Sequence, residues 1–157
     1  MGPFSTKLQL EIVCSHIKDA LEKGATLLEG GKQTKINNKG FFMTPGVLIN
    51  VSHNMKIMKE ETFGPITPIM KFQNIDQAVK LANDSDYGLT ASVWTQDLSK
   101  GEEIAKKIQA GTVEINRHGI SKAGCPWGGY KNSGIGRIYS KEGIREFTNT
   151  KHIWAVK

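Results

Sequence analysis

The chain has 157 residues, of which 38% are hydrophobic and 23% are charged, and these values are typical of one soluble globular domain. No apolar run is long enough to cross a membrane, and no basic-then-apolar signal follows Met1, so we expect a cytoplasmic protein without a membrane partner. The net charge of +6 comes from residues 100–157, where 11 Lys and Arg stand against 5 Asp and Glu. Cys14 and Cys125 are too few and too far apart for a disulfide framework or a zinc site, and we expect no metal.

The first element is expected to be a helix at residues 7–23. Thr6 and Gln9 have the spacing of a capping box, which marks a helix start, and Gly24 supplies a stop signal. Cys14 lies beside the apolar stripe of this helix, so we interpret its thiol as part of the core or its margin. The stripe consists of apolar residues at helical spacing: Leu8, Ile12, Val13, Ile17 and Leu21.

Short strands are expected next in the chain. Three segments are apolar enough to be strands: residues 25–29, 41–51 (interrupted by Pro45 and Gly46) and 66–72. Pro68 favours a sheet edge or a bulge for the third, because proline has no N–H to donate to a neighbouring strand. Residues 33–40 are interpreted as a polar loop, and residues 56–60 as a brief helical turn.

The second half of the chain repeats this alternation. Asn74 with Gln77, and Ser99 with Glu102, have the spacing of helix caps and predict two further helices. Strands are expected on either side of the second of these helices, at residues 89–95 and 112–116. Strand, helix and strand with short links are typical of parallel βαβ units, so the sequence predicts an α/β fold with a parallel sheet.

Periodicity disappears after the last of these strands. Residues 117–138 are rich in glycine, which indicates a long ordered loop of the kind that often carries function. Trp127 in this loop either walls an apolar pocket or plugs a gap in the core. A short helix is expected at residues 140–147. Residues 150–157 then alternate like a strand that has no hairpin partner in its own chain, so pairing with another subunit would satisfy its backbone groups.

Residues 60–65 (EETFGP) are unusually polar for a corner between two apolar runs. The Gly-Pro pair halts regular structure and can hold an acid and a ring at a fixed distance. A carboxylate accepts charge-assisted hydrogen bonds from vicinal sugar hydroxyls, and an aromatic ring offers its face to a planar heterocycle. We interpret the corner as half of a nucleotide-binding site. From these six residues alone, a solvated acidic turn is the alternative.

Three further motifs follow residues 60–65 in order: YGL at 87–89, GTV at 111–113 and PWGGYKNSGIGR at 126–137. Together the four motifs resemble the C-terminal portion of the NAD(P)-dependent aldehyde dehydrogenases, and the resemblance covers nearly the whole chain. It implies that residues 1–138 form part of a catalytic domain. Residues 139–157 would then form a C-terminal helix and an oligomerisation strand.

The resemblance also implies a chemistry. Members of this family oxidise an aldehyde to a carboxylic acid: a cysteine thiolate adds to the carbonyl, hydride passes to the nicotinamide, and a glutamate-activated water hydrolyses the thioester. By motif, Glu61 corresponds to the acid that holds the nicotinamide ribose, and Phe63 to the ring that packs against the nicotinamide. Trp127, Ser121 and Cys125 fall where the family lines its aldehyde pocket.

The departures from the family pattern limit this expectation. Neither the Gly-Gln-X-Cys context of the nucleophile nor the general-base block occurs, so we assign no catalytic residue to the chain. The sequence resembles the second half of an oxidoreductase that uses NAD or NADP on a small-molecule aldehyde. We expect the 157 residues alone to be inactive and to bind the cofactor weakly. We also expect a homo-oligomer or a complex with a complementing N-terminal half.

Two alternatives from other classes stay open at this point. In the first alternative, the chain is a non-catalytic module derived from that family, which binds a nucleotide or another protein. In the second, it is a basic nucleic-acid binder that uses residues 100–157. The basic residues are interleaved with apolar ones, and no recognised nucleic-acid motif accompanies them, so we expect no nucleic-acid partner.

Overall fold

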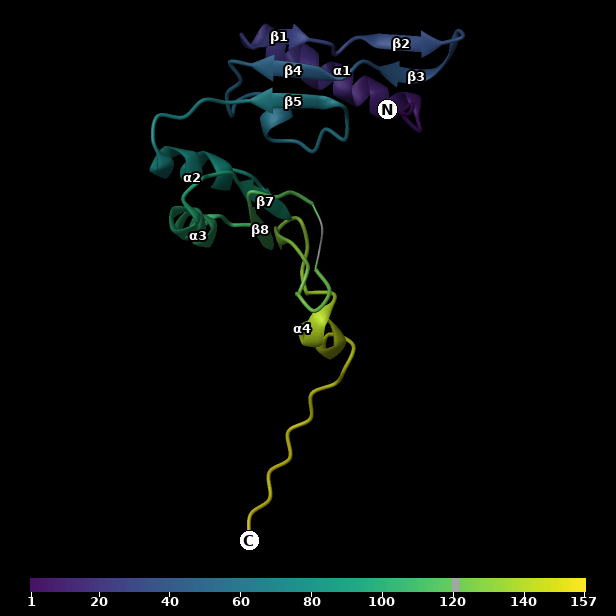
Figure 1. Cartoon of the computed structure of the whole chain (residues 1–157). Helices are drawn as coiled ribbons and strands as arrows, with labels where there is room; N and C mark the ends of the chain where they lie inside the picture. Colours follow the sequence, from purple (N-terminus) through teal and green to yellow (C-terminus); the bar gives the residue numbers. More distant parts are fainter. Residues whose placement is uncertain (120–121) are drawn as a thin grey trace. The chain divides into compact units, whose positions relative to one another are not determined.

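A computed structural model describes residues 1–119 and 122–157 of the chain (Figure 1). The chain divides into two compact units, Met1–Gln73 and Asn74–Lys157. No helix in the described part of the chain has both the length and the apolar character needed to cross a membrane.

The first unit is built on helix α1 (Lys7–Glu22) and a three-stranded sheet. The sheet has the order β1-β4-β5, with β4 in the centre, antiparallel to β1 and parallel to β5. Its strands are β1 (Thr26–Glu29), β4 (Gly46–Ile49) and β5 (Ile66–Ile69). Pro68 lies on β5 at the edge of this sheet, as predicted, because an edge strand needs no second row of donors.

A hairpin follows β1 where the sequence suggested only a polar loop. Strands β2 (Gln33–Ile36) and β3 (Lys39–Met43) pair antiparallel, so the prediction of a loop at residues 33–40 was wrong. Asn37 and Asn38 join the strands with φ angles of 51° and 59°, which is the left-handed pair that a two-residue hairpin turn requires. Asparagine tolerates this conformation, and the Asn-Asn pair was therefore a readable turn signal.

The core of the first unit lies between α1 and the strands. Figure 1 shows α1 passing behind β1 and β4, and the side chains between the helix and the strands are fully buried at Val13 and Leu48. The short 3-10 helix η1 (Lys56–Met58), expected as a helical turn, packs against α1. The buried cluster consists of Leu10, Val13, Ile17, Ala20, Ala25, Met43, Leu48, Val51, Met55, Ile57 and Ile66.

The second unit contains the predicted parallel βαβ unit. Strands β7 (Thr90–Val93) and β8 (Thr112–Ile115) pair parallel, and helix α3 (Leu98–Lys107) connects them. Helix α2 (Ile75–Asn83) precedes them and is capped by Asn74, as predicted. The cap of α3 is Asp97, whose carboxylate accepts from the Lys100 N–H at 3.0 Å. The prediction of Ser99 as the cap was wrong because the helix begins before that residue.

The glycine-rich segment after β8 is tied back to the rest of its unit. Strand β9 (Tyr130–Lys131) pairs antiparallel with β6 (Tyr87–Gly88), and helix α4 (Ser140–Arg145) follows. Residues 150–157 are exposed and form no strand with the described residues. Their pairing with another subunit stays a prediction.

Candidate functional site

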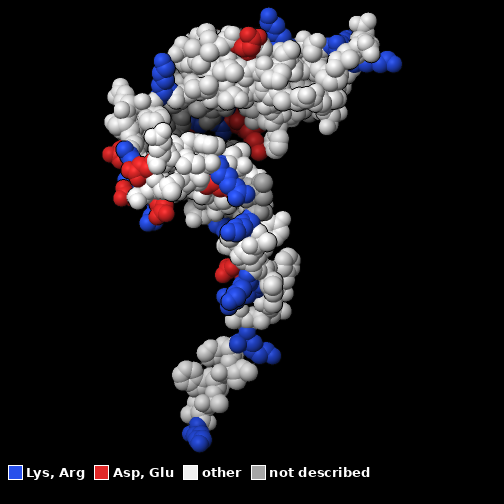
Figure 2. Space-filling model, viewed as in Figure 1, with Lys and Arg blue, Asp and Glu red and all other residues white. Residues whose placement is uncertain are grey.

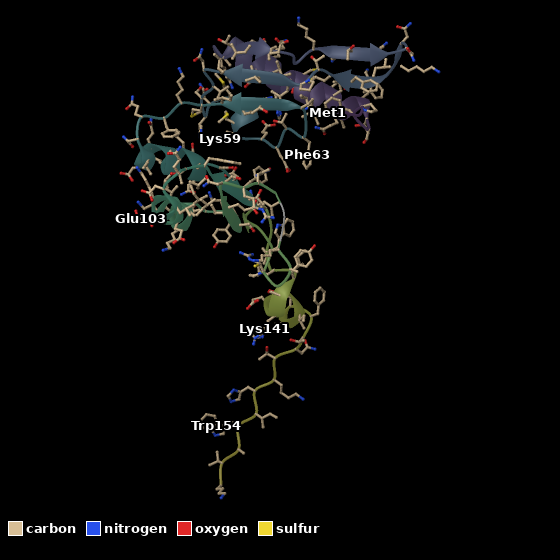
Figure 3. All side chains as sticks on the ribbon, viewed as in Figure 1. Met1, Lys59, Phe63, Glu103, Lys141 and Trp154 are labelled. Atoms are coloured by element: carbon tan, nitrogen blue, oxygen red, sulfur yellow. The ribbon has the colours of Figure 1, made fainter. Side chains whose placement is uncertain are left out.

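The corner at residues 60–65 presents its ring and one of its acids outward. Figure 3 shows Phe63 on the loop that leads into β5, and its side chain is 72% exposed. The φ angle of Phe63 is 44°, a left-handed value that costs about 1 to 3 kcal/mol in a residue with a side chain. Glu61 is also exposed, and no hydrogen bond or ion pair joins its carboxylate to residues 1–119 or 122–157. An exposed ring in a strained backbone beside an unpaired acid is unusual for a plain turn.

Helix α1 holds this corner through its side chains. Gln9 Nε2 donates to the carbonyl oxygen of Thr62 at 2.8 Å and to that of Phe63 at 3.3 Å. His16 contacts Thr62 Oγ1 through Nδ1 and Glu60 Oε2 through Nε2, both at 3.1 Å. These polar contacts hold the two residues that flank Glu61 and the carbonyl group of Phe63.

Close packing fixes the end of the corner. A side chain on Gly64 would place its Cβ 2.6 Å from Cγ2 of Val13, so only glycine allows the loop to lie this close to α1. The carbonyl oxygen of Pro65 accepts from the N–H of Gly46 at 2.8 Å, which joins the corner to the start of β4.

One titratable group strengthens the attachment of α1 to the segment before the corner. Asp19 accepts hydrogen bonds from Lys23 Nζ and from the Lys56 N–H, and these two donors hold the pKa of Asp19 below its ordinary value. Because Lys56 begins η1, this contact anchors the chain four residues before Glu60, the first acid of the corner.

A hollow of about 370 Å³ lies beside the glycine-rich segment of the second unit. Trp127 on its wall is half-buried and exchanges two backbone hydrogen bonds with Ile138, of 2.9 and 2.8 Å. Arg137 Nη1 donates to the carbonyl oxygens of Gly129 and Gly136, at 3.1 and 2.7 Å. These bonds join residues 127–138 to one another, although this stretch has little regular structure.

Glycine is required where this segment meets the start of β8. A Cβ on Gly111 would lie 1.6 Å from the carbonyl oxygen of Gly128, so the two backbones touch directly. This contact packs the loop that contains Trp127 against the βαβ unit.

The remaining predicted pocket residues are placed as follows. Cys125 is exposed, and its N–H donates to the carbonyl oxygen of Lys122 at 3.0 Å. Ser121 lies outside the described residues.

Cys14 packs against the core at its margin, as expected, and its Sγ accepts from Gln33 Nε2 at 3.0 Å. The described residues contain no group of three or more His, Cys, Asp or Glu that could hold a metal ion.

The basic residues of the second unit form no continuous surface on the face shown. In Figure 2 the Lys and Arg atoms of this unit stand in small separate groups between uncharged ones. Absence of a nucleic-acid partner stays a prediction.

Sequence reasoning missed the residues of α1 that hold the corner. Gln9 was interpreted only as part of a capping box, and His16 carried no motif. A weak signal existed, because Gln9 and His16 are seven residues apart and therefore lie on one face of a helix. The identity of their partners, 44 to 54 residues away, could not be read from that spacing.

The α/β fold, with an exposed acid and ring at a Gly-Pro corner, can be compared with known proteins, and the comparison identifies the family. The sequence profile described as "Aldehyde dehydrogenase family" matches residues 1–153. The chain belongs to the aldehyde dehydrogenase family, which confirms the resemblance found in the sequence.

Individual relatives agree with this assignment. The chain is 42% identical over 153 residues to a mitochondrial aldehyde dehydrogenase of Leishmania tarentolae, covering 98% of this chain and 30% of that protein. It is 42% identical over 152 residues to aldehyde dehydrogenase 1A1 of Homo sapiens, covering 97% of this chain and 30% of that protein. The chain thus spans about 30% of the length of these curated relatives.

Solved structures share the fold. Betaine aldehyde dehydrogenase from Staphylococcus aureus, in complex with NAD+, matches with a TM-score of 0.90 and 40% identity, over 98% of this chain and 31% of that one. Mycobacterium tuberculosis aldehyde dehydrogenase complexed with NAD+ matches with a TM-score of 0.88 and 42% identity, over 95% and 31%. The predicted α/β fold is confirmed.

Proposed function

We propose that this chain supplies cofactor-holding and pocket-lining residues to an oxidoreductase that converts an aldehyde to a carboxylic acid with NAD or NADP. The observation that carries the proposal is the exposed Phe63 ring, kept beside Glu61 in a strained backbone. Membership of the aldehyde dehydrogenase family supports the reaction class. The solved relatives named above, which are NAD+ complexes, support the cofactor class.

The residues at the corner fit a nicotinamide nucleoside. The exposed carboxylate of Glu61 accepts hydrogen bonds from the two ribose hydroxyls, which are charge-assisted and therefore strong. The exposed face of Phe63 packs against the planar nicotinamide. When bound, the nicotinamide would be the hydride acceptor. The role of this chain is to orient that ring.

The glycine-rich segment of the second unit has a separate role in this proposal. Trp127, Cys125 and Ser121 line the aldehyde pocket, with the half-buried indole of Trp127 as an apolar wall. Residues 1–138 belong to the catalytic domain, and residues 139–157 bind another subunit through the exposed strand-like segment at the end of the chain.

The 157 residues by themselves are inactive in this proposal. Cys14 is half-buried and its thiol accepts a hydrogen bond from Gln33, and Cys125 lies in the pocket segment outside the nucleophile context. Aldehyde oxidation therefore requires a nucleophile from a complementing N-terminal half. NAD-dependent oxidation of any aldehyde by the purified 157-residue chain would contradict this part of the proposal.

A titration with nicotinamide mononucleotide tests the cofactor role directly. This probe contains only the nicotinamide, its ribose and a phosphate, so it reports on Glu61 and Phe63 without the rest of the cofactor. We expect weak binding, with a Kd on the order of 1 mM, and NMR shift changes centred on residues 60–65. Glu61→Gln and Phe63→Ala should each weaken binding severalfold. Glu102→Gln, an exposed acid on α3, is the matched control and should leave it unchanged.

A further inference from the structure

His16 is the buried polar residue of the first unit, and its contacts are on the two residues that flank Glu61. Only 2% of His16 is exposed. Its ring bridges Glu60 Oε2 and Thr62 Oγ1, each at 3.1 Å. A buried polar side chain is costly unless it is hydrogen-bonded, and the corner supplies both partners of this ring.

His16 belongs to a stripe on one face of α1. Gln9, Val13 and His16 are spaced by four and three residues and therefore face the same side of the helix. Gln9 donates to the carbonyl oxygens of Thr62 and Phe63. Val13 lies where a side chain on Gly64 would collide with it. Three consecutive turns of α1 thus contact the corner from Glu60 to Gly64.

The chemistry of the partners fixes the roles of the ring nitrogens. A carboxylate only accepts hydrogen bonds, so Nε2 of His16 carries a hydrogen and donates to Glu60. In the neutral ring Nδ1 then accepts from the hydroxyl of Thr62, which is half-buried. The two contacts are mutually consistent in one tautomer.

We propose that His16 is a positioning residue for the nicotinamide nucleoside: by binding both neighbours of Glu61, it fixes the direction of that carboxylate and of the Phe63 ring. The inference rests on the proposed function of Glu61 and Phe63. Glu61 itself is untouched by His16, so its carboxylate stays available to the ribose while the backbone around it is held.

Gln9 and Val13 also hold this corner, but among the side chains of α1 only His16 contacts those of Glu60 and Thr62. Glu60 is 57% exposed, Glu61 and Phe63 are exposed, and the backbone of Phe63 is strained. A strained loop persists only where its surroundings determine it. Without His16, the side chains of Glu60 and Thr62 lose these contacts, so the segment around Glu61 becomes more mobile. Ordering that segment again on binding lowers the affinity for the ligand.

The test uses the full 157-residue chain and substitutions that separate the two contacts. His16→Phe removes both polar atoms and keeps a ring. His16→Asn restores a polar atom near Nδ1 and hence the contact with Thr62, and His16→Gln restores one near Nε2 and hence the contact with Glu60. Ser15→Ala is the matched control on α1, because the hydroxyl of Ser15 donates to Ile12 in its own helix.

NMR provides readouts that a purely structural role would not move. In the unmodified chain we expect the ring spectrum of His16 to show a protonated Nε2 and an acceptor Nδ1. His16→Phe should shift the amide signals of residues 60–64. It should also lower the affinity for nicotinamide mononucleotide about tenfold, which corresponds to ~1.4 kcal/mol. His16→Asn and His16→Gln should each recover part of that loss. If His16→Phe does not fold, Thr62→Val, which replaces the hydroxyl with a methyl group, should still shift the same amides and weaken binding of the probe.

The outcomes distinguish this inference from the proposed function. A folded His16→Phe chain with unchanged corner amides overturns the inference, whatever the probe does. If the unmodified chain does not bind the probe, the cofactor role is overturned. If the corner amides nevertheless shift in His16→Phe and return in His16→Asn, the positioning of the corner by His16 is still supported. Loss of affinity without rescue by either polar variant also counts against positioning.

Discussion

The two units of the chain differ in how much apolar surface they bury. The first unit contains the cluster around Val13 and Leu48, both fully buried. Among the described residues after Gln73, Ala110 is the only buried hydrophobic one. Several large apolar side chains of the second unit are exposed: Trp94, Leu98, Ile135, Ile144, Phe147, Ile153, Trp154 and Val156.

This difference indicates which parts of the proposed site the chain can form by itself. The first unit has the core needed to hold α1 against the corner at residues 60–65. The second unit has a parallel pair, β7 and β8, and parallel strands are normally covered on both faces. We therefore expect the corner to be well ordered in the isolated chain, and the pocket segment around Trp127 to depend on surfaces contributed by other chains.

The largest effect should come from the core of the first unit. Leu48→Ala removes a side chain that is fully buried on the central strand β4, and should lower the free energy of unfolding of this unit by about 3 kcal/mol. Leu28→Ala, on the neighbouring strand β1, is the control because Leu28 is 58% exposed, and should change stability by less than ~0.5 kcal/mol. Equal losses in denaturant unfolding of the two variants would contradict the contrast between core and surface.

The next effect tests the second unit, where backbone contact takes the place of a core. Gly111→Ala places a Cβ on the carbonyl oxygen of Gly128, and should destabilise the unit by about 2 kcal/mol through overpacking. Hydrogen exchange should rise in residues 111–138 and stay unchanged in the first unit. Gly2→Ala is the control, because no atom lies within 4 Å of its Cβ position.

A helix cap gives a smaller effect in the same unit. Asp97→Ala removes the carboxylate that accepts from the N–H of Lys100, and should cost about 1 kcal/mol. Ser99→Ala, inside the first turn of α3, should be nearly neutral. A larger loss in Ser99→Ala, measured by thermal unfolding, would restore the cap assignment that the sequence first suggested.

The strain at the corner should appear as a difference between two substitutions of one residue. At φ of 44° alanine keeps the strain and glycine relieves it, so Phe63→Gly should be more stable than Phe63→Ala by about 0.5 kcal/mol after the greater chain entropy of glycine is included. Both variants should lose affinity for nicotinamide mononucleotide, because both lack the ring. Equal stability of the two in denaturant would mean that the backbone at this position relaxes.

The smallest effects concern two carboxylates, one in each unit. Hydrogen bonds from Lys23 and Lys56 lower the pKa of Asp19, and a hydrogen bond from Ser140 with one from the backbone lowers that of Glu142. A folded pKa below the unfolded value means that the stabilisation is present above the unfolded pKa and is lost as pH falls through the folded pKa. The stability advantage of the unmodified chain over Asp19→Asn should therefore shrink below the ordinary Asp value of 3.8. An advantage that grows on acidification would contradict this sign.

Much of the fold was readable because its signals are local. Asn74 caps α2 as its spacing predicted, and the pattern of strand, helix and strand gave the parallel pair β7 and β8. The hairpin at Asn37 and Asn38 was missed because a polar composition was given more weight than a turn signal. Asp97 was missed because two capping residues stand close together, and packing of the helix decides between them.

The sequence by itself determined the α/β class, the family, and the two residues proposed to hold the nicotinamide nucleoside, since these follow from short motifs and from periodicity along the chain. Only the tertiary structure revealed that Gln9 and His16 of α1 contact the corner on which those residues lie. The reason is physical: a hydrogen bond of His16 depends on which atoms folding brings within about 3 Å of its ring. Its partners Glu60 and Thr62 are 44 and 46 residues further along the chain.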